Sequence, residues 1–152
     1  MLPRTPDRVP ASSSEDANRR IRQAIAESIR YHAAHPERID QRLRESAAEW
    51  AIERTLEANA AALGLAGTLL GIFVDRRFLA VPAVVTAFLL QHALHGWCPP
   101  LPLFRSRGVR TMREIDTERY ALKALRGDFG PIGPGPGDRD RRASHALQAA
   151  RL

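Results

Sequence analysis

Two long runs without a charged residue constrain the fold of this chain more than any other feature of its sequence. They are Ala58–Val74 and Phe78–Phe104, and only Asp75–Arg77 separates them. As helices, Ala58–Val74 and Phe78–Trp97 would be roughly 26 and 30 Å long. A hydrocarbon core about 30 Å thick needs about 20 residues, with about 17 as the lower limit. The sequence therefore predicts two transmembrane helices, and the short connection makes them an antiparallel hairpin.

A soluble hairpin buried in an assembly is the alternative to this membrane hairpin. Both runs are apolar around nearly their whole circumference, and a chain of 152 residues has little else with which to cover them. Membrane insertion is therefore the favoured interpretation.

Small residues recur at helical spacing in the first apolar run. Ala60 and Gly64 are four residues apart, as are Gly67 and Gly71. Such pairs let helix backbones approach closely, which favours packing in lipid. These four residues are the predicted helix-packing positions, either within the hairpin or in a homo-oligomer.

The rest of the chain is dense in charge and is predicted to be helical or disordered, so the fold class is all-α. Ile21, Ile25 and Ile29 recur with the period of an amphipathic helix, and Pro36 interrupts it. The predicted divisions are a disordered leader (1–13), cytoplasmic amphipathic helices (14–57), the hairpin with its Gly-Trp-Cys-Pro exit (58–104), an Arg-rich cytoplasmic helix (105–127) and a disordered tail (128–152).

The arginines predict the orientation of the hairpin. The chain has a net charge of +6, and Lys123 is its only lysine. Many arginines flank the outer ends of the two runs, whereas the connecting turn has only Arg76 and Arg77, so both termini are predicted to be cytoplasmic. The predicted partner is a bilayer with an anionic inner leaflet. The residues expected at that interface are Trp50, Trp97, Arg105, Arg107 and Arg110.

The stretch HALHGWCPP contains the residues whose side chains could bind a metal or act as a nucleophile. His92, His95 and Cys98 are three residues apart, and Cys98 is the only cysteine. They are weak candidates for a metal site, since a structural zinc usually needs four ligands and a fourth is not evident. Cys98 is a weak candidate for a catalytic thiol, because the C-terminal end of a helix disfavours a thiolate. Phosphate-loop and hydrolase motifs are missing, so neither an enzyme nor a cofactor is predicted.

The same stretch carries a resemblance to a known family. Gly96–Pro99 reads Gly-Trp-Cys-Pro after the second apolar run, and Leu103–Val109 follows it. With the two short apolar helices, this resembles the YgaP-like transmembrane hairpin family, over roughly residues 59–109. The resemblance implies a bacterial inner-membrane protein with both ends inside. The family's namesake has a rhodanese domain before the hairpin, whereas the first 57 residues here are helical and too short for one.

The sequence therefore predicts a small bacterial membrane protein that acts as an anchor or interaction module, alone, as a homo-oligomer or with a membrane partner. Persulfide or redox handling at Cys98 is the first alternative, and it depends on the resemblance. The second alternative is a soluble Arg-rich protein that binds nucleic acid through its flanking helices, which the apolar runs make less favoured.

Overall fold

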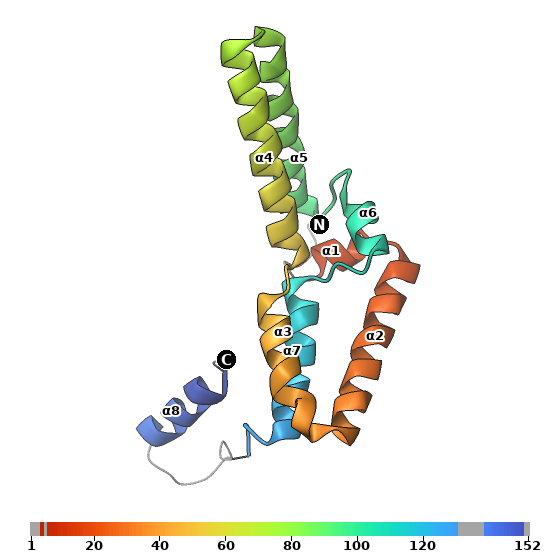
Figure 1. The fold of residues 1–152 in the computed structure, drawn as a ribbon, viewed down its shortest axis with the longest axis vertical. Coiled ribbons are helices and arrows are strands. Elements are labelled where there is room, and N and C mark those ends of the chain that lie inside the picture. Colours follow the sequence, from red (N-terminus) through yellow and green to blue (C-terminus); the bar gives the residue numbers. More distant parts are fainter. Residues whose placement is uncertain (1–3, 5, 131–138, 151–152) are drawn as a thin grey trace. The chain divides into compact units, whose positions relative to one another are not determined.

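All described secondary structure of the chain is helical. The computed structural model describes residue 4 and residues 6–130 and 139–150 (Figure 1), so parts of the expected leader and tail lie outside the described residues. The elements are α1 (Arg8–Ala11), α2 (Glu15–Ala34), η1 (Pro36–Arg38), α3 (Ile39–Ala48), α4 (Ile52–Phe73), η2 (Arg76–Leu79), α5 (Ala80–His95), α6 (Leu101–Ser106), α7 (Met112–Arg126) and α8 (Arg139–Ala150). The predicted all-α class is confirmed for these residues.

The chain forms two compact units. Unit 1 comprises Met1–Ile21 and Trp50–Arg113, and unit 2 comprises Arg22–Glu49 and Glu114–Leu152. The hairpin and the HALHGWCPP stretch both belong to unit 1, so unit 1 contains the candidate metal-binding and nucleophilic residues.

The two apolar runs of unit 1 form a helical hairpin, in which α4 and α5 lie side by side and η2 connects them (Figure 1). The Asp75 side chain accepts a hydrogen bond from the Arg77 backbone N–H, at 2.8 Å, and so fixes the turn. By length and composition, two helices of the described chain could cross a membrane, the one that ends at Phe73 and the one formed by Arg76–His95. Large apolar side chains of the hairpin point away from the seam and are exposed, among them Leu65, Ile72, Phe73, Val74, Val84 and Leu90.

Glycines allow the two helices of the hairpin to approach closely. A Cβ atom on Gly67 would lie 2.8 Å from the Pro82 ring and 2.8 Å from the Val81 Cβ atom, and one on Gly71 would overlap the Leu79 side chain. A Cβ atom on Gly64 would meet nothing within 4 Å. Of the predicted packing glycines, Gly67 and Gly71 therefore pack inside the hairpin, whereas Gly64 does not.

The C-terminal end of α5 packs against α1, which lies in the predicted leader. The Arg8 guanidinium donates a hydrogen bond to the Ala93 carbonyl, and the Ser12 hydroxyl donates one to the His95 carbonyl, both at 2.9 Å. The last carbonyls of a helix have no partner within it, so these side chains satisfy groups that would otherwise be orphaned. Val9 of α1 is buried in the same region. The prediction of a disordered leader therefore does not hold for residues 6–13.

Helix α5 ends at Gly96, which has a left-handed backbone conformation with φ of 82°. A Cβ atom at this position would overlap the Arg8 carbonyl group. Gly96 thus meets two requirements at once, because it supplies the turn that ends α5 and it leaves room for α1.

A small apolar cluster joins the base of the hairpin to the segment that follows it. Its buried members are Val9, Ile52, Leu56, Cys98 and Leu101, and Phe104 and Val109 pack against it. The start of α4 is attached to the same region, since the Ile52 N–H donates to the Arg110 carbonyl at 2.8 Å. Residues 49–51, just before this attachment, are not helical, so α3 and α4 are separate helices.

Arg105 lies inside this region and not on its surface. It is only 1 % exposed, and it donates hydrogen bonds to the Asn18 side-chain oxygen (2.8 Å) and to the Val109 carbonyl (3.1 Å). Arg110 is also buried. Neither guanidinium can reach lipid headgroups from this position, so the predicted interfacial role does not fit Arg105 or Arg110. The reason is that a fixed fork of donors suits a buried, multiply bonded position as well as a surface.

Unit 2 is held by apolar packing between α3 and α7 and by a buried carboxylate. Ile39, Leu43 and Leu122 form its core cluster. The Glu118 side chain is fully buried, where it accepts two hydrogen bonds from Arg42 (2.9 and 2.8 Å) and one from the Ser28 hydroxyl. A buried carboxylate is stable when it is paired in this way, so this contact ties α2, α3 and α7 together.

Helix α2 begins after Ser14, whose hydroxyl accepts a hydrogen bond from the Ala17 N–H. The tail differs from the sequence-based expectation, since residues 139–150 of the predicted disordered tail form α8. This difference concerns a short polar stretch, whose local pattern fits more than one structure.

Gly67→Ala should destabilise the hairpin, because the new Cβ atom meets the rigid Pro82 ring and Val81 Cβ atom. We expect a loss of about 1–3 kcal/mol in the free energy of unfolding, measured by titration from mild detergent into dodecyl sulfate. Gly64→Ala is the matched control, and it should be neutral or slightly stabilising because alanine favours helix. Equal effects at the two positions would contradict the packing described here.

Gly96→Ala should cost more stability than Gly108→Ala, although both glycines have nearly the same positive φ, 82° and 83°. Each substitution forces alanine into a left-handed conformation, at about 1–2 kcal/mol. Only Gly96→Ala also overlaps Arg8, since a Cβ atom on Gly108 has open space. The comparison of unfolding midpoints in detergent therefore measures the docking of α1 against α5, and equal losses would show that this docking contributes nothing.

Candidate functional site

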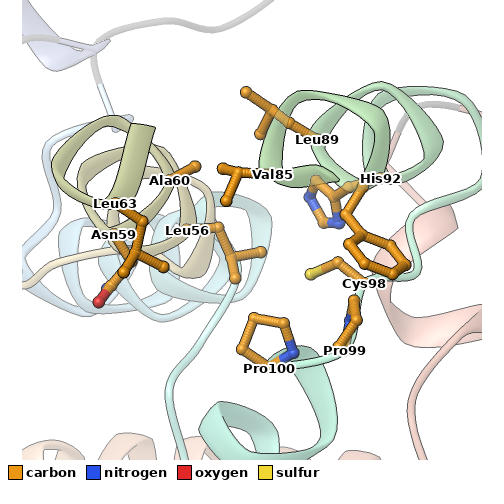
Figure 2. Close-up of a pocket in the computed structure, with 11 residues that line it drawn as sticks. Leu56, Asn59, Ala60, Leu63, Val85, Leu89, His92, Cys98, Pro99 and Pro100 are labelled. Carbon is orange, nitrogen blue, oxygen red and sulfur yellow. The ribbon is translucent and has the colours of Figure 1, made fainter. Parts of the chain in front are cut away.

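A cavity of about 230 Å³ lies at the base of the hairpin in unit 1 (Figure 2). Helices α4 and α5 form two of its walls, and the segment after Gly96 forms a third. The residues that line it are Leu56, Asn59, Ala60, Leu63, Val85, Phe88, Leu89, His92, Cys98, Pro99 and Pro100. The lining atoms are almost all apolar, and the Asn59 amide donates to the Thr55 carbonyl of its own helix. The cavity is thus suited to an apolar group.

His92 is the polar side chain that stands out in this cavity. It belongs to the last turn of α5, and its imidazole points into the cavity beside Cys98 (Figure 2). The side chain is only 6 % exposed, and neither ring nitrogen makes a hydrogen bond of ordinary geometry with the residues that the structure describes, although the backbone of Gly96 lies near the ring. A buried polar group without a partner is costly, so this imidazole calls for an explanation.

Cys98 reaches the cavity because the chain turns back at Gly96. The thiol is 5 % exposed and belongs to the apolar cluster of unit 1. Burial raises the pKa of the Cys98 thiol, and a backbone hydrogen bond from Leu101 offsets this only in part. A raised pKa leaves less thiolate at neutral pH, which disfavours a nucleophilic role.

A second, more polar hollow of about 180 Å³ shares His92 with the apolar cavity. It is lined by Arg8, Glu53, Leu56, Glu57, Leu89, His92 and Ala93. His92 therefore lines both an apolar cavity and a smaller hollow with charged walls.

The structure separates the candidates that the sequence grouped together. His92 and Cys98 share the cavity, whereas His95 is exposed. Within the described part of the chain, no group of three or more His, Cys, Asp or Glu side chains is arranged to hold a metal ion. His92 and Cys98 alone would supply two ligands, which is fewer than a stable zinc site needs.

The remaining candidates fall into two groups. Trp50, Trp97 and Arg107 are exposed in unit 1, as an interfacial role requires, and the Arg54 guanidinium lies over the Trp50 ring at 4.2 Å. Ala60 lines the cavity and has a different role from the packing glycines.

Chain comparisons give no match. Neither the protein-family models, nor the curated proteins, nor the solved structures contain one that is similar to this chain. The resemblance to the YgaP-like family therefore stays a prediction, and the site is interpreted from its own geometry.

Sequence reasoning missed the cavity itself and the part that Leu56 has in it. The cavity depends on the direction that the chain takes after α5, and the only signal for that direction is Gly96, a typical residue at a helix end. The burial of His92 was not predictable, since His95 belongs to the same helical turn.

Alkylation of Cys98 by N-ethylmaleimide should require a higher pH than alkylation of free N-acetylcysteine. The folded pKa of the thiol is raised, so its thiolate fraction reaches half only above the ordinary pKa. The measurement is the alkylation rate as a function of pH, with the protein unfolded in dodecyl sulfate as a control that should behave more like the free thiol. A midpoint at or below that of N-acetylcysteine would contradict the burial and would favour a thiol-based function.

Proposed function

We propose that the chain is a small integral membrane protein that acts as an anchor or interaction module. The observation that carries this proposal is the surface of the α4–α5 hairpin. Its seam is closed by Gly67 and Gly71, whereas its outward apolar side chains are exposed, up to 79 % at Phe73. Exposed apolar surface of this extent is typical of a surface that lipid or another protein covers.

The backbone of the hairpin supports the same proposal. Helices satisfy their own backbone hydrogen bonds, which is what a lipid environment requires. Polar side chains on the hairpin also bond within their helix, since the Thr68 hydroxyl donates to the Gly64 carbonyl and the Thr86 hydroxyl to the Pro82 carbonyl. The α4–α5 hairpin therefore has few polar groups that would need water.

The distribution of arginine supports an orientation with both termini in the cytoplasm. Arg8, Arg54 and Arg107 belong to the base of the hairpin in unit 1, opposite the turn with Arg76 and Arg77. Asp75 partly offsets the charge of that turn. The positive-inside rule then favours a multi-pass protein with both termini in the cytoplasm, and the family resemblance implies that the membrane is a bacterial inner membrane.

An interaction role has two candidate surfaces, one on the hairpin and one on unit 2. Gly67 and Gly71 already pack within the hairpin, so a homo-oligomer would need another surface, such as the open face around Gly64. Unit 2 has the charged surface and ion pairs of a water-exposed unit, including the contact of Arg126 with Asp40 and Asp128. We infer that the hairpin holds a cytoplasmic unit at the membrane.

The two other functions that the sequence left open receive less support. A thiol-based role is weakened by the raised pKa of Cys98. A nucleic-acid-binding role needs a face of free cations, but several arginines of the described chain bond to acidic or amide groups. These contacts are Arg19–Asp16, Arg42–Glu118, Arg105–Asn18, Arg113–Asp7, Arg119–Asp116 and Arg126–Asp40.

Membrane insertion is tested by fractionation and by cysteine accessibility. The full chain should stay in the membrane pellet after an alkaline carbonate wash, because the exposed apolar hairpin is covered only in lipid. In a Cys98→Ser background, Arg76→Cys should react with a membrane-impermeant maleimide in intact cells. Arg107→Cys, its matched control on the opposite end, should react only after the cells are opened.

Release of the chain by carbonate would overturn the proposed spanning hairpin. The reverse labelling pattern would retain the anchor but overturn its orientation.

A further inference from the structure

The cavity at the base of the hairpin, which is partly open, has no use in an anchor. We propose that it binds a neutral aromatic ring that carries a hydroxyl group, such as a phenol or the ring of a quinol, with His92 as the hydrogen-bond partner. The supply of such a ligand from the bilayer rests on the membrane insertion proposed above, whereas its fit to the cavity does not.

The size of the cavity suits a single substituted ring. An apolar protein cavity of about 150 Å³ accommodates benzene. A cavity of about 230 Å³ therefore has space for a ring with a short substituent. A rigid ring also loses less conformational freedom on binding than a flexible chain of the same volume.

The lining determines that the ligand is mainly apolar and uncharged. Apolar side chains of α4 and α5 and the rings of Pro99 and Pro100 form the walls (Figure 2). No Asp, Glu, Lys or Arg belongs to the residues that line it. An ion buried there would lose its hydration without gaining a partner of opposite charge, which is strongly unfavourable.

His92 determines that the ligand has a hydroxyl group. A neutral imidazole has one donor nitrogen and one acceptor nitrogen, and the backbone of Gly96 lies near enough to pair with only one of them. The other nitrogen is buried without a partner among the described residues. A hydroxyl group can donate to an acceptor nitrogen or accept from a donor nitrogen, whereas a hydrocarbon would leave that nitrogen unpaired.

Water and a lipid acyl chain satisfy these requirements less well. A buried water is stable with two to four polar partners, and this lining offers it little besides the imidazole. An acyl chain fills apolar space but forms no hydrogen bond. A ring with a hydroxyl group does both.

Cys98 supplies a direct measurement of occupancy, because it is the only cysteine and it lines the cavity. The full chain is purified in mild detergent, and its alkylation by N-ethylmaleimide is followed by mass spectrometry. The probe is 4-propylphenol, and propylbenzene is the comparison that lacks the hydroxyl group. We expect 4-propylphenol to slow the alkylation of Cys98 in a saturable way.

The role of His92 is tested with His92→Leu. This variant should weaken 4-propylphenol by about three- to tenfold, as expected for one hydrogen bond, and should leave propylbenzene unchanged. His92→Gln keeps a donor and an acceptor, so it should recover part of the preference for the hydroxyl group. It also keeps the test decisive if His92→Leu does not fold.

The role of the cavity is tested with Ala60→Leu, which fills it and should remove protection by both probes. Gly64→Ala is the matched control on the same helix, where added volume meets open space, and it should retain protection. The proposal is overturned if 4-propylphenol gives no saturable protection, or if both His92 variants change the two probes equally, as an acyl-chain site would require. Because binding is measured in micelles, its failure is distinct from a failure of carbonate-resistant insertion.

Discussion

The carbonyl groups at the C-terminal end of α5 need partners, and the base of unit 1 is arranged around this need. A helix within or near a hydrocarbon layer cannot rely on water for its last carbonyls. Here Arg8 and Ser12 satisfy two of them, and Gly96 ends the helix with space for α1 to approach. The same turn at Gly96 directs Cys98 back toward α5 and so closes the cavity next to His92. Capping, chain reversal and cavity formation therefore share one structural cause.

The hairpin was predictable from the sequence because its cause is local. Two uncharged runs of sufficient length, a short polar turn and small residues four apart each specify part of it, and the structure agrees with them. The glycine pattern did not reveal which partner each glycine meets. Gly67 faces α5 and Gly71 faces Leu79 of η2, whereas Gly64 faces open space, and this depends on the rotation of α4 about its axis, which a four-residue spacing leaves open.

The surroundings of the hairpin were less predictable because their causes are distant in sequence. Val9 lies in a stretch with the prolines and serines of a flexible leader, and it becomes ordered only through contacts with residues such as Ile52 and Leu101. Arg105 has the sequence context of an interfacial arginine, but Asn18 gives it a buried partner. In the candidate site, the sequence identified His92 and Cys98 as residues of interest. It could not identify their shared cavity, which depends on Leu56 of the other helix.

The contacts between α1 and α5 have a consequence for the order in which the protein assembles. Arg8 and Ser12 leave the ribosome early, but their partners Ala93 and His95 are synthesised 85 and 83 residues later. The first segment therefore waits without its partners until both helices of the hairpin have been made. Only then can it pack against the end of α5, so the base of unit 1 forms after both helices of the hairpin have been made.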